Sequence, residues 1–395
     1  MYEGQVSYWF YEWTIHQRYL LSGLISLGIG VIQEMKKTCF VLSGNAYLCP
    51  YLFNFYIDNT PGEKYLVYWN RDGVEETLGS IKGIEYAKPC PDTGLLRRLY
   101  SYFAYMLFVN KQLLNSDFDH IVLLNTIAGY FAFPALLIKY RKRYVMDVRD
   151  YGGEFNPILG LMSRAIVSFA GIVVLSSRFY AAFLAPSEYS YVHNLQRPSF
   201  SDLDASSCVN SLNGNPSLPI VIAFIGSVGQ YIEQHVKLIN MFKNDSRFRL
   251  MFAGAGSEKL KDYCRNNHVE NVQLLGRFAP EKMYSLYTGV NIIHNLYGNG
   301  DPFLDYAISN KMYIAAQLHM PILVCPNTAM ETMASDYGIG FTLDLDNTNV
   351  NWPDLLFEYY TGLDSNSFIK GCEKLLTDAY NDNQNYSDRY TSFIS

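Results

Sequence analysis

The chain has 395 residues, of which 31 are basic and 37 acidic, so its net charge is −6. Apolar residues make up 49% and charged residues 17%, which is enough for a large core and excludes a chain that is disordered throughout. The excess of acid argues against a general nucleic-acid-binding protein, because such proteins are usually basic. At roughly 100–200 residues per domain, the length predicts two or three domains.

The first 34 residues lack the pattern of a secretion signal or a membrane span. Residues 19–33 are apolar for about 15 positions and contain three glycines, whereas a span needs about 20 apolar residues. Glu3 and Glu12 stand where a signal peptide would carry basic residues. Two interpretations stay open: residues 1–34 are an extension upstream of a natural start at Met35, or they form an interfacial membrane segment. We favour the first and expect activity and membrane binding to survive their removal.

From residue 35 onward, apolar runs of strand length alternate with stretches of helical periodicity. This alternation is typical of parallel sheets that are covered on both faces. In the first half we expect an amphipathic helix at 97–115 and strands at 38–43, 65–69, 120–124, 144–148 and 172–176. In the second half we expect strands at 219–225, 248–253, 271–275, 290–295, 321–325 and 339–343. The helices of that half are expected at 233–244, 257–267, 280–288, 309–319 and 329–336.

The pattern predicts an α/β protein with two doubly wound, Rossmann-like parallel-sheet domains. Residues 199–218 are rich in Ser, Asn, Asp and Gly, which is linker composition. We therefore expect a first domain over 35–198 and a second over 219–364, facing each other across a cleft. In this architecture ligands bind at the carboxyl ends of the strands. His193 stands just before the linker, and we expect a structural role for it near the hinge.

The cysteines give no sign of a metal site or a disulfide framework. All seven are scattered, none forms a Cys-x-x-Cys pair, and no Cys/His spacing suits zinc. Cys39 and Cys325 lie in apolar runs and are expected to be small core residues. A reducing cytoplasm fits this usage best, and no metal is expected.

Charge is distributed unevenly along the chain. Residues 35–200 carry a net charge of +4, whereas residues 201–395 carry −8. The densest positive cluster consists of Lys139, Arg141, Lys142 and Arg143. This cluster could face anionic lipid, or it could be the solvated end of a helix.

Two turns in the second half have the composition of phosphate sites. The strand at 219–225 ends in the turn Gly226–Gly229, whose glycines let backbone approach a ligand closely. Glycine is also common at such turns for structural reasons. Ser309 is expected to cap a helix with Lys311 in its first turn, where free N–H groups and the helix dipole favour an anion. Lys311 is therefore predicted to bind a diphosphate, the alternative being an exposed lysine at a helix start.

Polar residues in the first half follow expected strands and would face the same cleft. Arg149 and Asp150 follow the strand at 144–148. The Asp150 carboxylate could act as a general base or bind an acceptor hydroxyl, and the alternative is an Asp/Arg surface pair. Gly44 and Asn45 end the first strand and would point at the same place.

The chain resembles bacterial two-domain GT-B glycosyltransferases of capsule, exopolysaccharide and O-antigen clusters, of the group 1 type. In the second half the matching stretches are IGSVGQY, NDSRFRLMFAGAG, NVQLLGRFAPEKMYSLY, NIIHNLYGNG and AISNKMYIAAQLHMPILVCPNTAMETMASDYGIGF. In the first half VMDVRDY, VVLSSRFYAAFL and YVHNL are similar to acceptor-domain segments. The resemblance covers roughly 35–345.

This resemblance implies transfer of a sugar from a nucleotide diphosphate, expected to be a UDP-sugar, to a lipid-linked or oligosaccharide acceptor in surface polysaccharide synthesis. Such a hexosyltransferase would be cytoplasmic, in peripheral contact with the inner face of the plasma membrane. It would need no metal or other cofactor and bind no nucleic acid. A helix over 365–395 would pack back on the first domain.

The resemblance also implies roles for single residues. Donor-binding residues of the second domain would be Gly226, Ser227, Arg277, Phe278, Asn310, Lys311, Tyr313 and Glu331. The catalytic residues would be Asp150 and Lys311, with Gly44, Asn45 and Arg149 on the acceptor side.

One departure from the family pattern concerns the reaction itself. Many retaining relatives carry two glutamates eight positions apart, the second of them seven before a proline. Here Tyr306 and Ile314 occupy those positions before Pro321, so retention and inversion both stay open, with Asp150 as the base of an inverting enzyme. The alternatives are a GT-B-fold sugar-nucleotide epimerase and a non-catalytic partner subunit.

Overall fold

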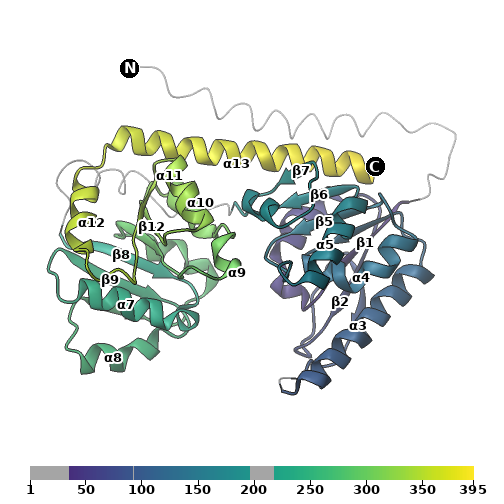
Figure 1. Ribbon diagram of the computed structural model, residues 1–395, viewed down its shortest axis with the longest axis horizontal. Helices are drawn as coiled ribbons and strands as arrows, with labels where there is room; N and C mark the ends of the chain where they lie inside the picture. Colours follow the sequence, from purple (N-terminus) through teal and green to yellow (C-terminus); the bar gives the residue numbers. More distant parts are fainter. Residues whose placement is uncertain (1–34, 92, 196–217) are drawn as a thin grey trace. The chain divides into compact units, whose positions relative to one another are not determined.

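The computed structural model describes residues 35–91, 93–195 and 218–395 (Figure 1). The expected extension 1–34 and nearly all of the expected linker 199–218 lie outside these ranges. Lys36–Ser395 form one unit. No helix in the described ranges is both long and apolar enough to cross a bilayer.

The first sheet has seven parallel strands in the order β3-β2-β1-β4-β5-β6-β7. Their bounds are β1 Lys37–Leu42, β2 Glu63–Trp69, β3 Lys82–Tyr86, β4 His120–Leu123, β5 Tyr144–Val148, β6 Ile172–Leu175 and β7 Tyr189–Tyr191. Every residue of β5 and β6 is buried, as expected for central strands covered on both faces.

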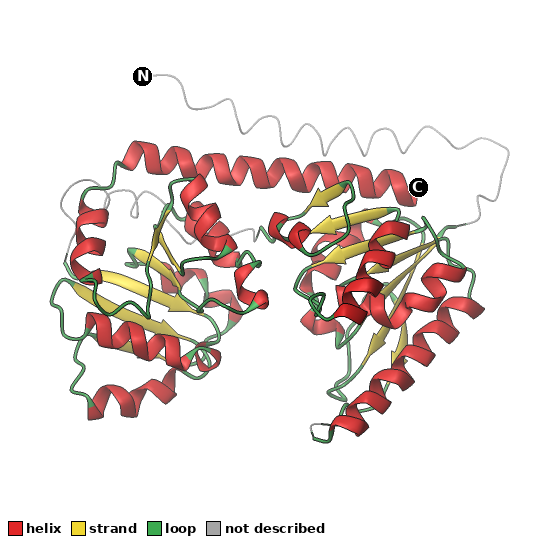
Figure 2. Cartoon of the chain, in the orientation of Figure 1, coloured by secondary structure: helices red, strands yellow, loops and turns green. Residues whose placement is uncertain are grey.

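Helices cover both faces of this sheet (Figure 2). On one face lie α3 (Leu95–Asn115), α4 (Thr126–Ile138) and α5 (Pro157–Phe169), which share one hydrophobic core. The other face has a separate core, to which the short segments η1 (Ala46–Leu48), η2 (Leu52–Tyr56) and α2 (Ile57–Asn59) contribute. A further 3₁₀ turn, η3 (Arg178–Ala182), connects β6 to β7.

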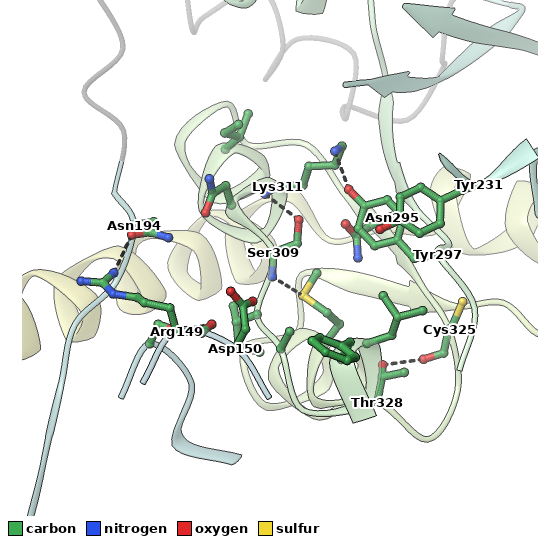
Figure 3. A pocket seen from close by; sticks show the side chains of 18 of the residues that line it. Arg149, Asp150, Asn194, Tyr231, Asn295, Tyr297, Ser309, Lys311, Cys325 and Thr328 are labelled. Atoms are coloured by element: carbon green, nitrogen blue, oxygen red, sulfur yellow. Dashed lines mark hydrogen bonds between the residues drawn. The ribbon is translucent and has the colours of Figure 1, made fainter. Parts of the chain in front are cut away.

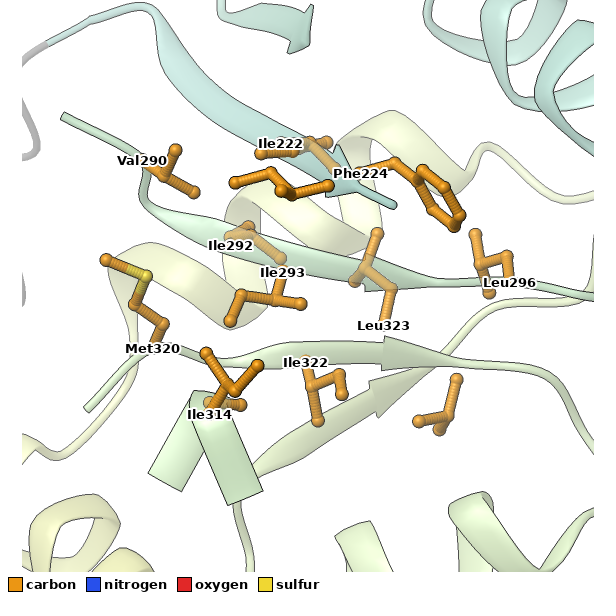
Figure 4. Close-up of a cluster of buried hydrophobic side chains, with 14 of the residues drawn as sticks. Ile222, Phe224, Val290, Ile292, Ile293, Leu296, Ile314, Met320, Ile322 and Leu323 are labelled. Carbon is orange, nitrogen blue, oxygen red and sulfur yellow. The ribbon is translucent and has the colours of Figure 1, made fainter. Parts of the chain in front are cut away.

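The second sheet has six parallel strands in the order β10-β9-β8-β11-β12-β13. Their bounds are β8 Ile220–Ile225, β9 Phe248–Ala253, β10 Val272–Leu275, β11 Ile292–Asn295, β12 Ile322–Val324 and β13 Gly340–Thr342. The helices are α7 Ile232–Phe242, α8 Leu260–Asn266, α9 Pro302–Asp305, α10 Asn310–Gln317, α11 Ala329–Asp336 and α12 Trp352–Thr361. Side chains of β8, β11 and β12, among them Ile222, Ile292 and Leu323, form the centre of its core (Figure 4).

The last helix, α13 (Ser365–Ile394), packs against elements of both domains. It packs against α10 and β7, and its distal residues Tyr386 and Tyr390 belong to the core of the first sheet. The Tyr386 hydroxyl lies 2.7 Å from the Tyr56 hydroxyl, and the Tyr390 hydroxyl lies 2.7 Å from Oγ1 of Thr60. Buried hydroxyls thus fix this helix to η2 and to Thr60 at the end of α2.

The fold class predicted from the sequence is confirmed, and each predicted strand is present within two residues of its expected bounds. Two edge strands were missed, β3 and β7, because neither has an apolar run: β3 buries only Tyr86 and β7 is half-buried throughout. The helix expected at 280–288 is wrong. That segment forms two 3₁₀ turns, η7 (Pro280–Lys282) and η8 (Tyr284–Tyr287), a form common in short connectors.

Candidate active site

A pocket of about 540 Å³ lies where loops at the carboxyl ends of the two sheets meet (Figure 3). Its volume falls within the range of small-molecule sites. From the first half of the chain it is lined by Pro50, Tyr51, Arg149, Asp150, Ser176, Tyr180 and Asn194. Polar and aromatic lining residues from the second half include Tyr231, Asn295, Tyr297, Ser309, Asn310, Lys311 and Thr328.

Lys311 is buried at the start of α10, and its side chain lies in this pocket. Ser309 caps the helix, since its Oγ accepts a hydrogen bond from the Lys311 N–H at 3.3 Å. The lysine is only 8% exposed. Its Nζ donates to the Tyr297 hydroxyl at 2.7 Å and lies 4.5 Å from the centre of the Phe224 ring. The alternative of an exposed lysine at a helix start is therefore wrong.

The charge of Lys311 has no carboxylate partner among the described residues. Burial alone lowers the pKa of its ammonium group to about 8, because the charged form loses its hydration. At pH 7 the group is still mostly protonated. A buried cation without a counter-ion favours an anionic ligand.

Gly226 lies next to the Lys311 amine, but no residue of the turn Gly226–Gly229 lines the pocket. A Cβ at Gly226 would stand 3.4 Å from Nζ of Lys311, and the φ of Gly226 is +152°. The turn also packs tightly against Gly254, where a Cβ would fall 1.7 Å from the Gly226 carbonyl oxygen. Only glycine suits these two positions. Ser227, next in the turn, is exposed and lies outside the pocket lining.

Two tyrosines that sequence reasoning missed form an aromatic wall beside Lys311. The rings of Tyr231 and Tyr297 stack with centroids 4.3 Å apart, and both line the pocket. Tyr297 also holds the lysine amine through its hydroxyl. The sequence gives little indication of their role, because each tyrosine stands in a loop outside any periodic segment.

Arg149 lines the pocket as half of a buried ion pair. Its Nε and Nη2 donate to the two Asp147 carboxylate oxygens at 2.7 and 2.9 Å, and Tyr56 donates to the same carboxylate at 2.7 Å. Nη1 donates to Asn194 at 2.8 Å, and the guanidinium lies 4.2 Å from the centre of the Tyr51 ring. The alternative of an Asp/Arg surface pair is therefore wrong: the pair is buried, and it joins Asp147 to Arg149.

Asp150 lies at the pocket with an exposed side chain. The surrounding protein raises the pKa of its carboxyl group by displacing water, and the charge of Arg149 offsets part of this rise. A carboxylate with a raised pKa is a better proton acceptor at neutral pH. Asp150 thus lines the pocket, and its role as a general base stays a prediction.

The remaining predicted residues divide between the pocket and other places. Asn310 lines the pocket beside Lys311. Arg277, which is exposed, and Phe278, which is half-buried, follow β10 outside the pocket lining. Glu331 accepts a hydrogen bond from the Asn327 N–H at 2.6 Å at the start of α11, and it too is absent from the lining.

Gly44 and Asn45 follow β1 and do not line the pocket either. Asn45 is buried, and its side chain donates to Asn70 at 2.9 Å and accepts from the Arg71 N–H at 3.0 Å. Gly44 has open space around its Cβ position. Through these hydrogen bonds, the Asn45 side chain holds the loop that follows β2 in place.

Tyr313 points away from the pocket toward the hinge. Its hydroxyl lies 2.6 Å from Nδ1 of His193, and Nε2 of that histidine lies 2.9 Å from the Asp382 carboxylate on α13. The Asn383 side chain also bonds both backbone groups of His193, at 2.6 and 3.0 Å. His193 therefore joins α10, α13 and the segment that precedes the expected linker.

Two buried histidines behind Lys311 are neutral, and their placement gives a pH prediction. His294 Nδ1 accepts from the Leu296 N–H at 3.0 Å, so its Nε2 carries the proton and donates to His235 Nδ1 at 3.1 Å. Burial lowers the pKa of His235 to about 3 and that of His294 well below 6.5.

No group of three or more His, Cys, Asp or Glu in the described ranges is arranged for a metal ion.

Because the unfolded chain protonates these histidines near pH 6.5 and the folded chain does not, stability should fall as pH drops below 6.5. For His235, whose pKa falls to about 3, the cost should be roughly 2 kcal/mol between pH 6.5 and pH 5. His235→Phe should reduce the loss of unfolding free energy between pH 7 and pH 5 by about that amount, as measured by urea titration at both pH values. Equal losses in both proteins would contradict the neutral pair.

Comparison with solved structures identifies the fold. The sucrose-phosphate synthase of Thermosynechococcus elongatus has a TM-score of 0.63 at 8% identity, over 90% of this chain and 100% of that chain. The HepE protein of Anabaena, in complex with UDP-glucose, has a TM-score of 0.56 at 14% identity, over 90% and 99%. The lipopolysaccharide outer core galactosyltransferase WaaB has a TM-score of 0.60 at 14% identity, over 90% and 99%.

No family model matches the sequence, and no curated protein matches it either. The chain has the GT-B fold, with two parallel-sheet α/β domains of seven and six strands. At these identities the likeness establishes the fold alone.

Proposed function

We propose that the protein is a glycosyltransferase that moves a sugar from a nucleotide diphosphate, with a UDP-sugar as the donor, to an acceptor hydroxyl. The observation that carries the proposal is the buried Lys311 ammonium, which lies in the pocket next to Gly226 and has no carboxylate partner in the described part of the chain. A diphosphate would supply the missing negative charge. The HepE protein, whose structure contains UDP-glucose, has the same fold.

In this reaction the bond from the sugar's anomeric carbon to the diphosphate oxygen breaks, and negative charge grows on the diphosphate. Lys311 and the first-turn N–H groups of α10 would stabilise that charge. The hydrogen bond to Tyr297 fixes the amine, so little reorganisation accompanies bond breaking. The new bond joins the anomeric carbon to the acceptor oxygen.

The acceptor hydroxyl must lose a proton as this bond forms. Asp150 is the exposed carboxylate that the first half of the chain contributes to the pocket, and its raised pKa suits a general base. With Asp150 in that role the reaction inverts the anomeric centre, because base and leaving group stand on opposite sides of the sugar.

We further propose that the acceptor is a lipid-linked sugar of surface polysaccharide synthesis at the cytoplasmic face of the plasma membrane. WaaB, a lipopolysaccharide outer core galactosyltransferase, has the same fold. Incubation with a panel of sugar nucleotides and a native lipid-linked acceptor, followed by product analysis, tests this. Epimerised sugar nucleotide formed without acceptor would instead support an epimerase. Nucleotide binding without turnover on any acceptor would support a partner subunit.

Chelation should leave the transfer rate unchanged. The positive charge that faces the diphosphate comes from Lys311 and the start of α10, so the leaving group needs no divalent cation. Initial rates with excess EDTA and with added Mg²⁺ check this. A drop of tenfold or more in EDTA that Mg²⁺ restores would contradict it.

A further inference from the structure

Two buried asparagines stand at the two ends of β11. Asn291 precedes the strand and Asn295 is its last residue, and they are 9% and 4% exposed. Asn291 has a partner for each end of its amide. Its Oδ1 accepts from the Val221 N–H at 2.8 Å, and its Nδ2 donates to the Tyr360 hydroxyl at 3.1 Å. These bonds join β8 to α12 at the amino edge of the second sheet.

Asn295, at the carboxyl edge, is at least as deeply buried but lacks such bonds. Its Oδ1 has no hydrogen-bond partner among the described residues, and its Nδ2 donates to none of them. A buried amide oxygen in this state is unfavourable, because it has lost its hydrogen bonds to water and gained none within the protein. Since buried polar groups in folded proteins are nearly always paired, the missing partner points to a ligand.

The position of Asn295 indicates which part of a ligand it would meet. It lines the pocket together with Tyr297 and Lys311 (Figure 3). Among the buried side-chain oxygen and nitrogen atoms that lack a partner in the described ranges, Oδ1 of Asn295 is the one whose residue lines this pocket. The Asn295 carbonyl accepts from the Tyr297 N–H at 3.1 Å, and the Tyr297 hydroxyl accepts from Lys311. The amide is therefore a neighbour of the site proposed for the diphosphate.

The chemistry of an amide narrows the choice of ligand group. It offers one acceptor oxygen and two N–H donors, and a half-turn about the Cβ–Cγ bond exchanges them, so that either can be presented to the pocket. Ionised diphosphate oxygens only accept hydrogen bonds and would leave Oδ1 unpaired. Two neighbouring hydroxyls pair with the whole amide, because one donates to Oδ1 while the other accepts from Nδ2.

A nucleotide sugar carries such diols next to its diphosphate. They occur on the ribose and on the transferred sugar, and each of these rings is joined directly to the diphosphate. The edge of a uracil base also has the donor and acceptor that an amide needs, but the ribose separates it from the diphosphate. A diol is thus the group that meets both the chemistry of Asn295 and its place beside Lys311 and Tyr297.

We propose that the Asn295 amide binds a vicinal diol of the donor, on the ribose or on the transferred sugar, and makes the enzyme selective for donors that carry both hydroxyls. The proposal rests on the proposed function, since it takes Lys311 to hold the diphosphate. A donor without these hydroxyls would leave the amide unpaired in the occupied pocket, which is how a buried polar group rejects a deoxy analogue.

Calorimetry on wild-type protein, Asn295→Leu and Asn295→Ala tests the proposal. The ligands are UDP, 2′,3′-dideoxy-UDP, and whichever of UDP-glucose, UDP-galactose and UDP-N-acetylglucosamine the wild type binds best. Leu replaces the amide with an apolar group of similar shape, and Ala cannot obstruct the pocket. If the ribose supplies the diol, wild type should bind dideoxy-UDP about tenfold more weakly than UDP, and both variants should bind the two equally. If the sugar supplies it, UDP should bind all the proteins alike, and the UDP-sugar should bind both variants about tenfold more weakly than wild type.

Melting temperatures without ligand separate this role from a structural one. Asn295→Leu should melt at the wild-type temperature or above it, because the substitution removes an unpaired buried amide. The matched control is Asn291→Leu, which breaks both bonds of a paired amide at the other end of the same strand. It should melt several degrees lower than wild type and keep wild-type affinity for every ligand.

A fall of several degrees in the melting temperature of both Asn295 variants would make the residue structural and overturn the proposal. Variants that bind all the ligands as wild type does would also overturn it. An equal loss of affinity for UDP and for dideoxy-UDP would assign the amide to the base, with the same consequence. Wild-type protein that binds none of the ligands would contradict the proposed function itself, and this inference with it.

Discussion

Asp150→Asn should lower the turnover number by about 10²- to 10⁴-fold, the usual effect of losing a general base. The amide has the size of the carboxylate and cannot accept the acceptor's proton. Affinity for the nucleotide should be unchanged, because Lys311 and the Gly226 turn stand on the other domain. Initial rates and nucleotide titrations on both proteins separate the two effects.

The pH profile offers a second readout of Asp150. The base must be ionised, so wild-type turnover should fall as pH drops toward its raised pKa, and Asp150→Asn should lose this acid limb. Glu281→Gln, an exposed carboxylate on η7 outside the pocket lining, is the control and should behave as wild type. Turnover of Asp150→Asn within threefold of wild type would remove Asp150 from the mechanism and with it the argument for inversion.

Lys311→Ala should weaken nucleotide diphosphate binding about 10- to 100-fold, because a charge-assisted hydrogen bond contributes roughly 1.5–3 kcal/mol. Turnover should fall too, since part of the interaction develops only as the leaving group gains charge. The variant should not lose stability without ligand. Its melting temperature should stay put or rise slightly, because the substitution removes a buried charge as well as packing.

Lys311→Met isolates the effect of that charge, since Met fills similar space. The pKa of Lys311 falls from 10.5 to about 8 in the fold, so below pH 8 its charge destabilises the folded state by roughly 3 kcal/mol. That cost disappears as pH rises from 8 to 10.5, where the folded chain alone gives up the proton. Lys311→Met should therefore melt higher than wild type at pH 7 and by a smaller margin at pH 10. A lower melting temperature at pH 7 would make Lys311 a structural residue.

The sheets were predictable because buried parallel strands have continuous apolar runs, whereas β3 and β7 lack such runs and were not. The pocket was only partly predictable. Asp147 and Arg149 lie on the same side of the chain because side chains alternate along a strand, and they form an ion pair. Asp150 lies on the other side, and its carboxylate lines the pocket without joining that pair. Tyr313 stands two positions after Lys311 on a helix, about 200° around its axis, and so it points toward His193 instead.

The burial of Lys311 could not be predicted from its position in a helix start. It depends on Phe224 from β8 and Tyr297 after β11, which are far apart in the sequence and meet only because those strands are neighbours. Tyr231 joins Tyr297 for the same reason. Such contacts depend on strand order, which the apolar pattern alone does not specify.

Calorimetry of uridine and of UDP on wild-type protein, Lys311→Ala and Lys311→Met tests most directly whether Lys311 binds the donor's diphosphate. Uridine should bind all three proteins alike, whereas UDP should bind both variants about 10- to 100-fold more weakly than wild type. Wild-type affinity for UDP should also fall between pH 7 and pH 9.5, as the ammonium group loses its proton near pH 8, and the variants should lack this dependence. Variants that lose uridine and UDP equally, or that keep full affinity for UDP, would contradict the account.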